Sequence, residues 1–146
     1  MDADMLKQLI RRYENASFMV ERRFNAMLRE TMSGELTADQ YSVMRFIQDR
    51  GRCTSSELSD LFCVGKSSIT AIITRLSDKK LIRRIPDEKD RRVTYLSLTE
   101  EGEALTNRIG QMIHELLSKY LQHFDASEAE AFIRTYEKLA RMLEER

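Results

Sequence analysis

The chain has 146 residues, of which 42% are hydrophobic and 33% are charged, and its formal net charge is zero. This length fits one domain, or one small domain with an oligomerisation element, and the single proline and five glycines argue against a β-sandwich, which needs frequent turns. Because no run of eighteen apolar residues occurs and the N-terminus is acidic and then amphipathic, we expect no membrane partner and no signal peptide, and hence a cytoplasmic protein.

Charge is distributed unevenly along the sequence. Residues 50–92 carry eleven basic and six acidic side chains, whereas residues 1–49 carry seven and eight, and residues 93–146 carry six and ten. A basic middle between acidic ends is typical of a DNA-facing module on a scaffold that stays off the DNA. The alternative is a chance fluctuation of charge on solvated helices.

Catalytic chemistry finds little support in the sequence. Cys53 and Cys63 offer no disulfide framework, and no Cys or His accompanies His114 or His123 at metal-ligand spacing. A phosphate-binding glycine loop and a GxSxG motif are both missing. We therefore expect no enzyme activity, no metal site and no cofactor.

The first predicted helix covers residues 4–32. Its apolar residues follow three-or-four spacing throughout, and Ser33-Gly34 ends it, glycine being the usual left-handed terminator. A helix of about 28 residues is about 42 Å long, more than a small core covers. Part of its apolar stripe is therefore expected to need a second subunit.

Two capping boxes start the next two predicted helices, one at Thr37 with Gln40 and one at Thr54 with Glu57. A third helix, at about 65–78, follows the second after only a few residues. Two short helices joined so tightly predict a helix-turn-helix whose second helix is presented to DNA.

The helix at 65–78 has two different faces. Its apolar positions are Ile69, Ile72, Ile73 and Leu76. The outer face carries hydroxyl and cationic side chains that can reach base edges and phosphates, and the predicted contacts are Lys66, Ser67, Ser68, Thr70, Thr74 and Arg75, with Ser55 from the preceding helix. The alternative is that any single Ser or Thr of this helix is simply a solvated residue. However, Ser and Thr are mediocre helix formers, and their concentration in one short helix favours a functional surface.

A charged hairpin follows. Residues 83–85 and 93–98 predict two strands, and Pro86 limits pairing before the loop at 87–92. The fold class is therefore mainly α with a small β-hairpin (α+β), a winged helix-turn-helix. Predicted DNA contacts in the hairpin are Arg83, Lys89, Arg91 and Arg92.

Two further helices complete the chain. The first begins near Thr99, and a capping box at Ser127 with Glu130 is predicted to start the second. Long apolar faces at both ends of the chain predict an intertwined dimer. The expected division is residues 1–35 for dimerisation, 36–98 for DNA binding and 99–146 for dimerisation.

Three stretches carry a family resemblance: LTADQYSVM, ELSDLFCVGKSSITAIITRLSDKKLIRR and DEKDRRVTYLSLTEEG. In order and spacing they resemble the multiple-antibiotic-resistance regulator (MarR) family of bacterial transcription factors, over essentially the full chain. The hairpin pattern of the family falls on Asp87, Lys89, Asp90 and Arg92, and its L-T-x-x-G motif on residues 98–102.

The resemblance implies a homodimeric regulator, a repressor, that binds double-stranded DNA at a pseudo-palindromic operator. One recognition helix would enter each major groove and one wing each flanking minor groove. Arg92, with Arg91, would enter the minor groove, where A·T-rich tracts concentrate negative potential. Asp87 or Asp90 would brace the loop by pairing with an arginine; the alternative is a plain exposed ion pair, worth about 0–1 kcal/mol.

The sequence departs from the family pattern at three positions. Gly65 stands where Ser or Asn usually caps the recognition helix, at a cost of a few tenths of a kcal/mol. Ala71 replaces an arginine that often faces the groove, which leaves at most a thymine methyl contact. Lys80 replaces a glycine, so the turn into Leu81 is expected to differ.

The resemblance also implies regulation, by a small phenolic or lipophilic effector in a cleft between the dimer helices and the DNA-binding lobe, or by oxidants through a cysteine. The oxidant-sensing cysteine of the family lies in the first helix, whereas Cys63 is expected to be a small core residue here. The alternative function is a winged-helix module whose basic stripe docks an acidic protein.

Overall fold

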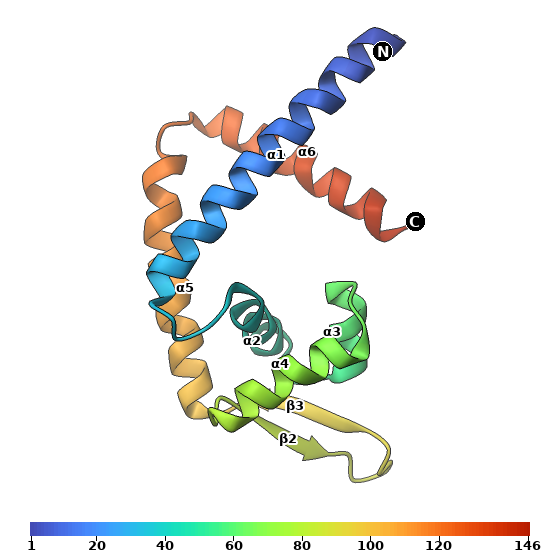
Figure 1. Ribbon diagram of the computed structural model, residues 1–146, viewed down its shortest axis with the longest axis vertical. Coiled ribbons are helices and arrows are strands. Elements are labelled where there is room, and N and C mark those ends of the chain that lie inside the picture. The colour runs from blue at the N-terminus through green and yellow to red at the C-terminus, as the bar shows by residue number, and fades with distance from the viewer. The chain divides into compact units, whose positions relative to one another are not determined.

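The computed structural model describes residues 1–146 as six helices and three short strands (Figure 1). The chain forms two compact units, Met1–Ile109 and Gly110–Arg146, and each is considered by itself. The first unit holds the helix-turn-helix and the sheet, so the mainly helical α+β fold class is confirmed.

Helix α1 (Ala3–Met32) begins at Asp2, whose carboxylate accepts a hydrogen bond from the amide of Met5 at 2.8 Å. The helix ends at Ser33, which itself takes the left-handed conformation with φ 50°, and Gly34 follows with φ 78°. Serine therefore occupies the position for which glycine was predicted. Among all residues of α1, only Leu28 and Met32 are buried within this chain.

Helices α2 (Ala38–Arg50) and α3 (Ser55–Phe62) begin at the two predicted capping boxes, which are confirmed. The Thr37 hydroxyl accepts from the Gln40 amide at 3.1 Å, and the Gln40 side chain accepts from the Thr37 amide at 3.2 Å. Strand β1 (Cys53–Thr54), which was not predicted, lies between these helices.

The expectation that Cys63 is a core residue is wrong, because the residue is exposed. Cys63 adopts φ 53° at the end of α3, and the following amide, that of Val64, donates to the carbonyl of Ser59 at 3.3 Å. A left-handed residue at a helix end reverses the chain direction, which here turns the thiol toward solvent. The other cysteine, Cys53, is buried.

Helix α4 (Lys66–Asp78) buries Ile69, Ile73 and Leu76. Its C-terminus closes in a Schellman motif: the Leu81 amide donates to the Leu76 carbonyl at 3.0 Å, and the Lys80 amide to that of Ser77 at 2.9 Å. Lys80 has φ 61°. It thus keeps the backbone geometry that glycine usually provides, and the expected change in the turn is not seen.

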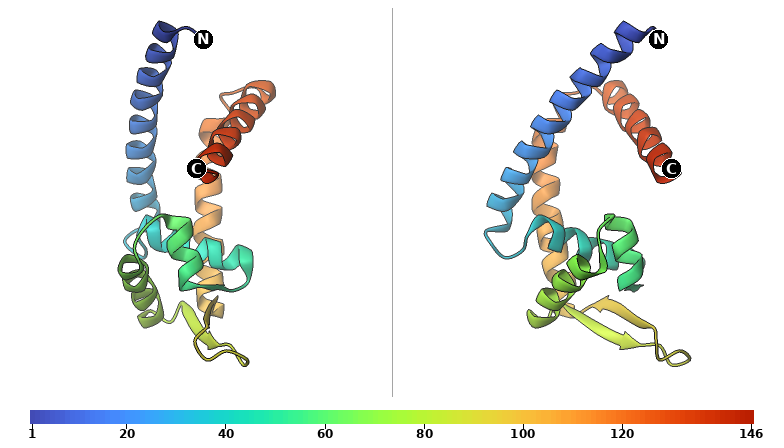
Figure 2. Two further views of the ribbon diagram at one scale, coloured as in Figure 1. Left: turned by 90° about the vertical axis from the view of Figure 1, so that its right-hand side faces the viewer. Right: turned by 45° about the vertical axis from the view of Figure 1, so that its right-hand side comes forward.

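Strands β2 (Ile82–Pro86) and β3 (Thr94–Leu98) pair antiparallel, and the sheet order is β1-β3-β2. Residues directly opposite each other share a face of the sheet. One face therefore carries Ile82 with Leu98, both buried, and the other carries Arg83 with Ser97. The loop of this hairpin extends beyond the helices of the first unit (Figure 2).

Helix α5 (Glu100–Leu121) packs its first turn onto the end of the α4 turn. The Thr99 hydroxyl donates to the Lys80 carbonyl at 2.7 Å and accepts from the Gly102 amide at 3.0 Å. A β-carbon on Gly102 would overlap the carbonyl oxygen of Leu81. The L-T-x-x-G motif thus joins α5 to the helix-turn-helix, threonine by hydrogen bonds and glycine by close approach.

Helix α6 (Ala126–Glu144) begins at Asp125, whose carboxylate accepts from the Glu128 amide at 2.8 Å. The predicted start at Ser127 with Glu130 is therefore wrong by two residues. The Ser127 hydroxyl donates to Asp125 instead, at 2.9 Å, because the carboxylate already caps the helix.

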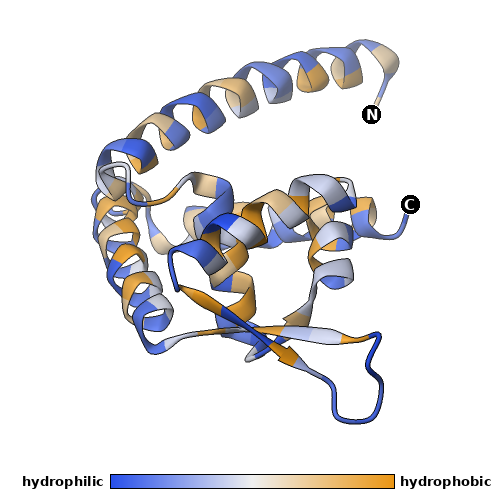
Figure 3. Ribbon diagram, turned by 60° about the horizontal axis from the view of Figure 1, so that its bottom comes forward, coloured by the Kyte–Doolittle hydropathy of each residue, from blue (hydrophilic) through white to orange (hydrophobic).

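Apolar side chains remain exposed along both terminal helices. Figure 3 shows hydrophobic positions alternating with hydrophilic ones along α1. No residue of α6 is buried, although Phe132 and Tyr136 stack on each other with ring centroids 5.5 Å apart. None of the six helices combines the length and apolar character that a membrane span needs.

Candidate nucleic-acid interface

The exposed side of α4 carries the predicted contacts. Ile69, Ile73 and Leu76 face the core, and the opposite side is left to hydroxyl and cationic side chains because the helix repeats every 3.6 residues. The exposed residues of this surface are Lys66, Ser67, Ser68, Thr70, Ala71, Thr74 and Arg75. The Thr70 hydroxyl donates to the Lys66 carbonyl at 2.7 Å, so only its lone pairs remain for a ligand.

The start of α4 leaves backbone donors free. Gly65 precedes the helix and supplies no side-chain cap. First-turn amides have no partner within a helix, and the N-terminal end of a helix carries positive partial charge. An exposed, uncapped N-terminus of this kind favours phosphate contact. Ser55, the first residue of α3, is also exposed.

A shallow groove of about 230 Å³ lies between α3, α4 and the sheet. It joins Ser55 and Thr70, two predicted contacts, to Arg84. Arg84 lies opposite Leu96 on the face of the sheet that is directed to the core, whereas Arg83 lies opposite Ser97 on the other face. The structure thus brings Arg84, rather than the predicted Arg83, beside the recognition helix.

The signal that could have identified Arg84 was present in the sequence. Alternate residues of a strand share a face, so Arg84 lies on the side of Ile82, which is buried. On the opposite face, the Arg52 guanidinium lies 4.1 Å from the centre of the Tyr95 ring. Arg83, Tyr95 and Arg52 therefore form a separate basic and aromatic surface.

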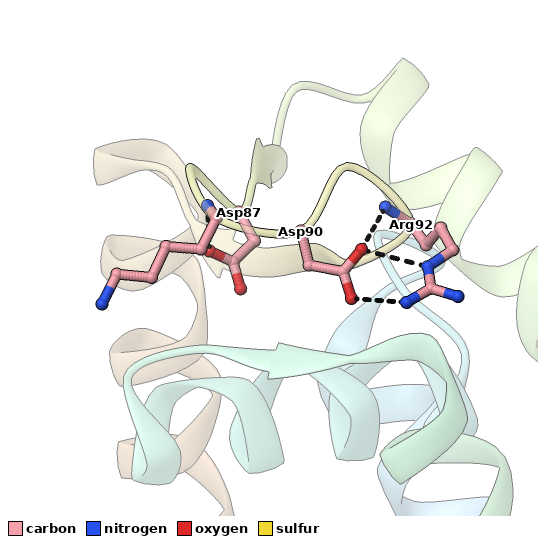
Figure 4. Close-up of polar contacts among 4 residues, drawn as sticks. Asp87, Asp90 and Arg92 are labelled. Atoms are coloured by element: carbon pink, nitrogen blue, oxygen red, sulfur yellow. Dashed lines mark hydrogen bonds and ion pairs between the residues drawn. The ribbon is translucent and has the colours of Figure 1, made fainter.

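The hairpin loop is held by its own aspartates (Figure 4). Asp90 accepts from Nε of Arg92 at 3.2 Å, from Nη2 at 3.4 Å and from the backbone amide at 3.0 Å. Asp87 pairs with no arginine and accepts instead from the Lys89 amide at 3.0 Å. Of the two candidate braces, Asp90 is thus the one that holds an arginine.

Two hydrogen bonds from Arg92 lower the pKa of Asp90 below its usual value, the larger effect coming from the guanidinium and the smaller from the backbone amide. This carboxyl therefore stays ionised at neutral pH. The Arg92 side chain is nevertheless 91% exposed, which keeps it available to a partner. Arg91 is exposed and makes no hydrogen bond or ion pair within the chain. The loop therefore presents two arginines, one oriented by a carboxylate and one free.

Unpaired positive charge distinguishes the whole surface. Among the exposed cations of α4, Arg84 and the hairpin loop, which are Lys66, Arg75, Arg84, Lys89, Arg91 and Arg92, only Arg92 takes part in an ion pair. Cations without internal partners can neutralise phosphates without first breaking a salt bridge. No group of His, Cys, Asp and Glu side chains is arranged to hold a metal.

A helix-turn-helix followed by an antiparallel hairpin, with free cations on both, defines the winged helix-turn-helix class of DNA-binding domains. The comparisons specify the family. The MarR family model matches residues 36–94. MarR, the multiple antibiotic resistance protein of Salmonella typhimurium, is 31% identical over 109 residues, which cover 71% of this chain and 76% of that protein. The chain belongs to the MarR family.

Two further proteins bear on the comparison. The transcriptional regulator FarR of Neisseria gonorrhoeae is 34% identical over 80 residues, and the match spans about half of each protein, 55% of both. A mutant MarR from E. coli complexed with operator DNA shares the fold, with a TM-score of 0.76 and 24% identity over 86% of this chain and 91% of that one.

Proposed function

We propose that this chain is a homodimeric transcriptional repressor that binds a pseudo-palindromic site in double-stranded DNA and responds to a small-molecule effector. One observation carries the proposal: α4, Arg84 and the hairpin loop expose six cations near hydroxyl side chains, and only Arg92 among them has an internal ion-pair partner. In this proposal residues 36–98 bind DNA, and residues 1–35 and 99–146 dimerise.

The two parts of the surface have different tasks. The hydroxyls of Ser67 and Thr74 and the guanidinium of Arg75 suit the major groove, where base edges present distinct donors and acceptors. Arg91 and Arg92 suit the narrow minor groove, where A·T-rich tracts attract arginine. Asp90 restricts the rotamers of Arg92, so less side-chain entropy is lost when DNA binds.

In this proposal a second copy of the chain packs against the exposed apolar faces of the terminal helices α1 and α6. Helix α1 has 30 residues and a length of about 45 Å, yet Ile10 and Phe18 are 49% and 58% exposed. In α6, Phe132 and Tyr136 are 63% and 54% exposed. Such extended apolar faces are costly in water and mark interaction sites, and isologous pairing of two copies is the commonest solution.

The test is the salt dependence of binding to duplex DNA selected with the purified full-length protein. Each phosphate neutralised contributes about −0.9 to the slope of log affinity against log salt. Arg92→Ala should lower affinity and flatten this slope by about two for a dimer. An affinity for DNA that does not change with salt would exclude the proposal and favour the alternative, docking of an acidic protein.

A matched pair of variants tests the assignment of the strand. Arg84→Ala should weaken binding by at least about tenfold, since a charge-assisted contact is worth roughly 1.5–3 kcal/mol. Arg83→Ala removes the same charge from the opposite face and should have a smaller effect. If Arg83→Ala weakens binding more than Arg84→Ala, the outer face of the sheet contacts DNA instead.

A further inference from the structure

The outer face of the sheet, which is the face opposite the core, carries a second group of charged and apolar side chains. It holds the odd-numbered residues of β2 and β3, because residues directly opposite each other share a face. Arg83 lies opposite Ser97 in one row of this face. Ile85 lies opposite Tyr95 in the next row. All of these residues belong to the unit Met1–Ile109.

Arg52 extends the first row on the other side of β3. Strand β1 pairs Cys53 with Leu96, and one step back along this register puts the chain beside Ser97. The Ser97 hydroxyl accordingly donates to the Gly51 carbonyl at 3.3 Å. The two arginines of the row are therefore separated at the backbone by two strand spacings, about 10 Å, with only a serine between them.

Apolar side chains form the second row. Ile85 is 37% exposed, and Tyr95 is half-buried. The Arg52 guanidinium lies over the Tyr95 ring, 4.1 Å from its centre. A guanidinium held over an aromatic ring has fewer rotamers to lose on binding and keeps N–H donors for a further partner. The outer face therefore joins oriented positive charge to apolar surface.

The positive charge on this face has no counter-charge. None of the three strands contains an acidic residue, and neither Arg52 nor Arg83 takes part in an ion pair. Arginine and tyrosine are enriched at the centres of protein interfaces. A DNA backbone would use the two charges and leave the apolar row exposed, whereas a peptide can meet both. We propose that the outer face docks an acidic segment of a partner protein that also carries an apolar side chain.

The recognition chemistry follows from the two rows. Carboxylates of the segment accept bidentate hydrogen bonds from Arg52 and Arg83, and the apolar side chain covers Ile85. Arg84 lies on the opposite face of β2, so docking leaves the proposed DNA surface free. One chain could then hold DNA and a protein at the same time. This inference goes beyond the proposed function, and docking of the segment does not require DNA.

The first experiment selects peptides from a displayed library of short random sequences on the full-length protein. Peptides that bind the double variant Arg52→Ala, Arg83→Ala are removed first. That variant keeps the cations of α4 and the hairpin loop, so its use discards peptides that only imitate DNA. The remaining peptides should be enriched in Asp and Glu together with an apolar residue. Absence of acidic enrichment would overturn the proposal.

Fluorescence anisotropy with one selected acidic peptide then locates the site. Arg83→Ala should weaken peptide binding about tenfold, and so should replacement of the peptide's Asp and Glu by Asn and Gln. Arg84→Ala is the matched control, because it removes the same charge from the same strand on the opposite face. It should keep peptide affinity within about threefold of the wild type and lower DNA affinity. Equal losses of peptide affinity in the two variants would overturn the assignment.

Duplex DNA separates this inference from the proposed function. Peptide affinity should be the same with and without saturating DNA. If DNA displaces the peptide, the outer face meets DNA, and docking of a protein there is overturned. If the protein binds the peptide but no duplex DNA, the proposed function fails and the docking surface stands. DNA binding by Arg83→Ala, expected to exceed that of Arg84→Ala, reports that the variant is folded.

Discussion

Replacement of Lys80 by glycine is expected to stabilise the protein. Lys80 is exposed and holds φ 61° in the turn after α4. In this left-handed conformation the β-carbon of an L-residue comes close to the following carbonyl oxygen. This conformation destabilises an L-residue by about 1–2 kcal/mol, whereas glycine adopts it without that steric cost. Glycine loses more backbone freedom on folding, by about 0.5–1 kcal/mol. The difference is a gain of about 0.5–1 kcal/mol for Lys80→Gly.

The assay is urea unfolding at fixed protein concentration, because a dimer gains apparent stability with concentration. A shift of the midpoint at constant slope reports a change in stability. Lys80→Ala is the matched control: it removes the charge and the long side chain and keeps the β-carbon. Its free energy of unfolding should lie within about 0.5 kcal/mol of the wild type.

The comparison of Lys80→Gly with Lys80→Ala tests whether the left-handed conformation at residue 80 is strained. If Lys80→Gly is no more stable than Lys80→Ala, the left-handed conformation costs nothing, and the strain argument fails. The Schellman hydrogen bonds, from the Leu81 and Lys80 amides to Leu76 and Ser77, are made by the backbone and survive both substitutions.

Three further outcomes are expected. Gly102→Ala should destabilise the protein by about 1–3 kcal/mol in urea unfolding, because the new methyl group overlaps the Leu81 carbonyl; wild-type stability would disprove the close approach. Asp90→Asn should weaken DNA binding several-fold in fluorescence titration, because Arg92 loses its orienting carboxylate; tighter binding would mean that Asp90 only repels phosphate. Burial raises the pKa of the Cys53 thiol to about 11, from 9.0, so the folded state opposes ionisation. Stability should therefore fall as the pH rises from about 9 to about 11, by roughly 1–3 kcal/mol, and Cys53→Ala should remove this dependence.

Features set by neighbouring residues were determined by the sequence. The capping boxes at Thr37 and Thr54 form as predicted, because a hydroxyl and a side chain three residues later satisfy each other's backbone amides. The buried stripe of α4 follows from the period of its apolar residues. The start of α6 was misplaced because Asp125 and Ser127 are both good caps, and spacing alone does not choose between them.

Features that depend on distant segments were decided only by the tertiary structure. Pairing with β3 puts Arg84 beside α4 and Arg83 on the opposite face, and strand β1 exists only because β3 lies next to it. Arg29 of α1 and Arg75 of α4 line one cavity, although 46 positions separate the two residues in the sequence. Local patterns fix which elements form, because hydrogen bonds and periodicity act over a few residues. The packing of those elements fixes which side chains meet.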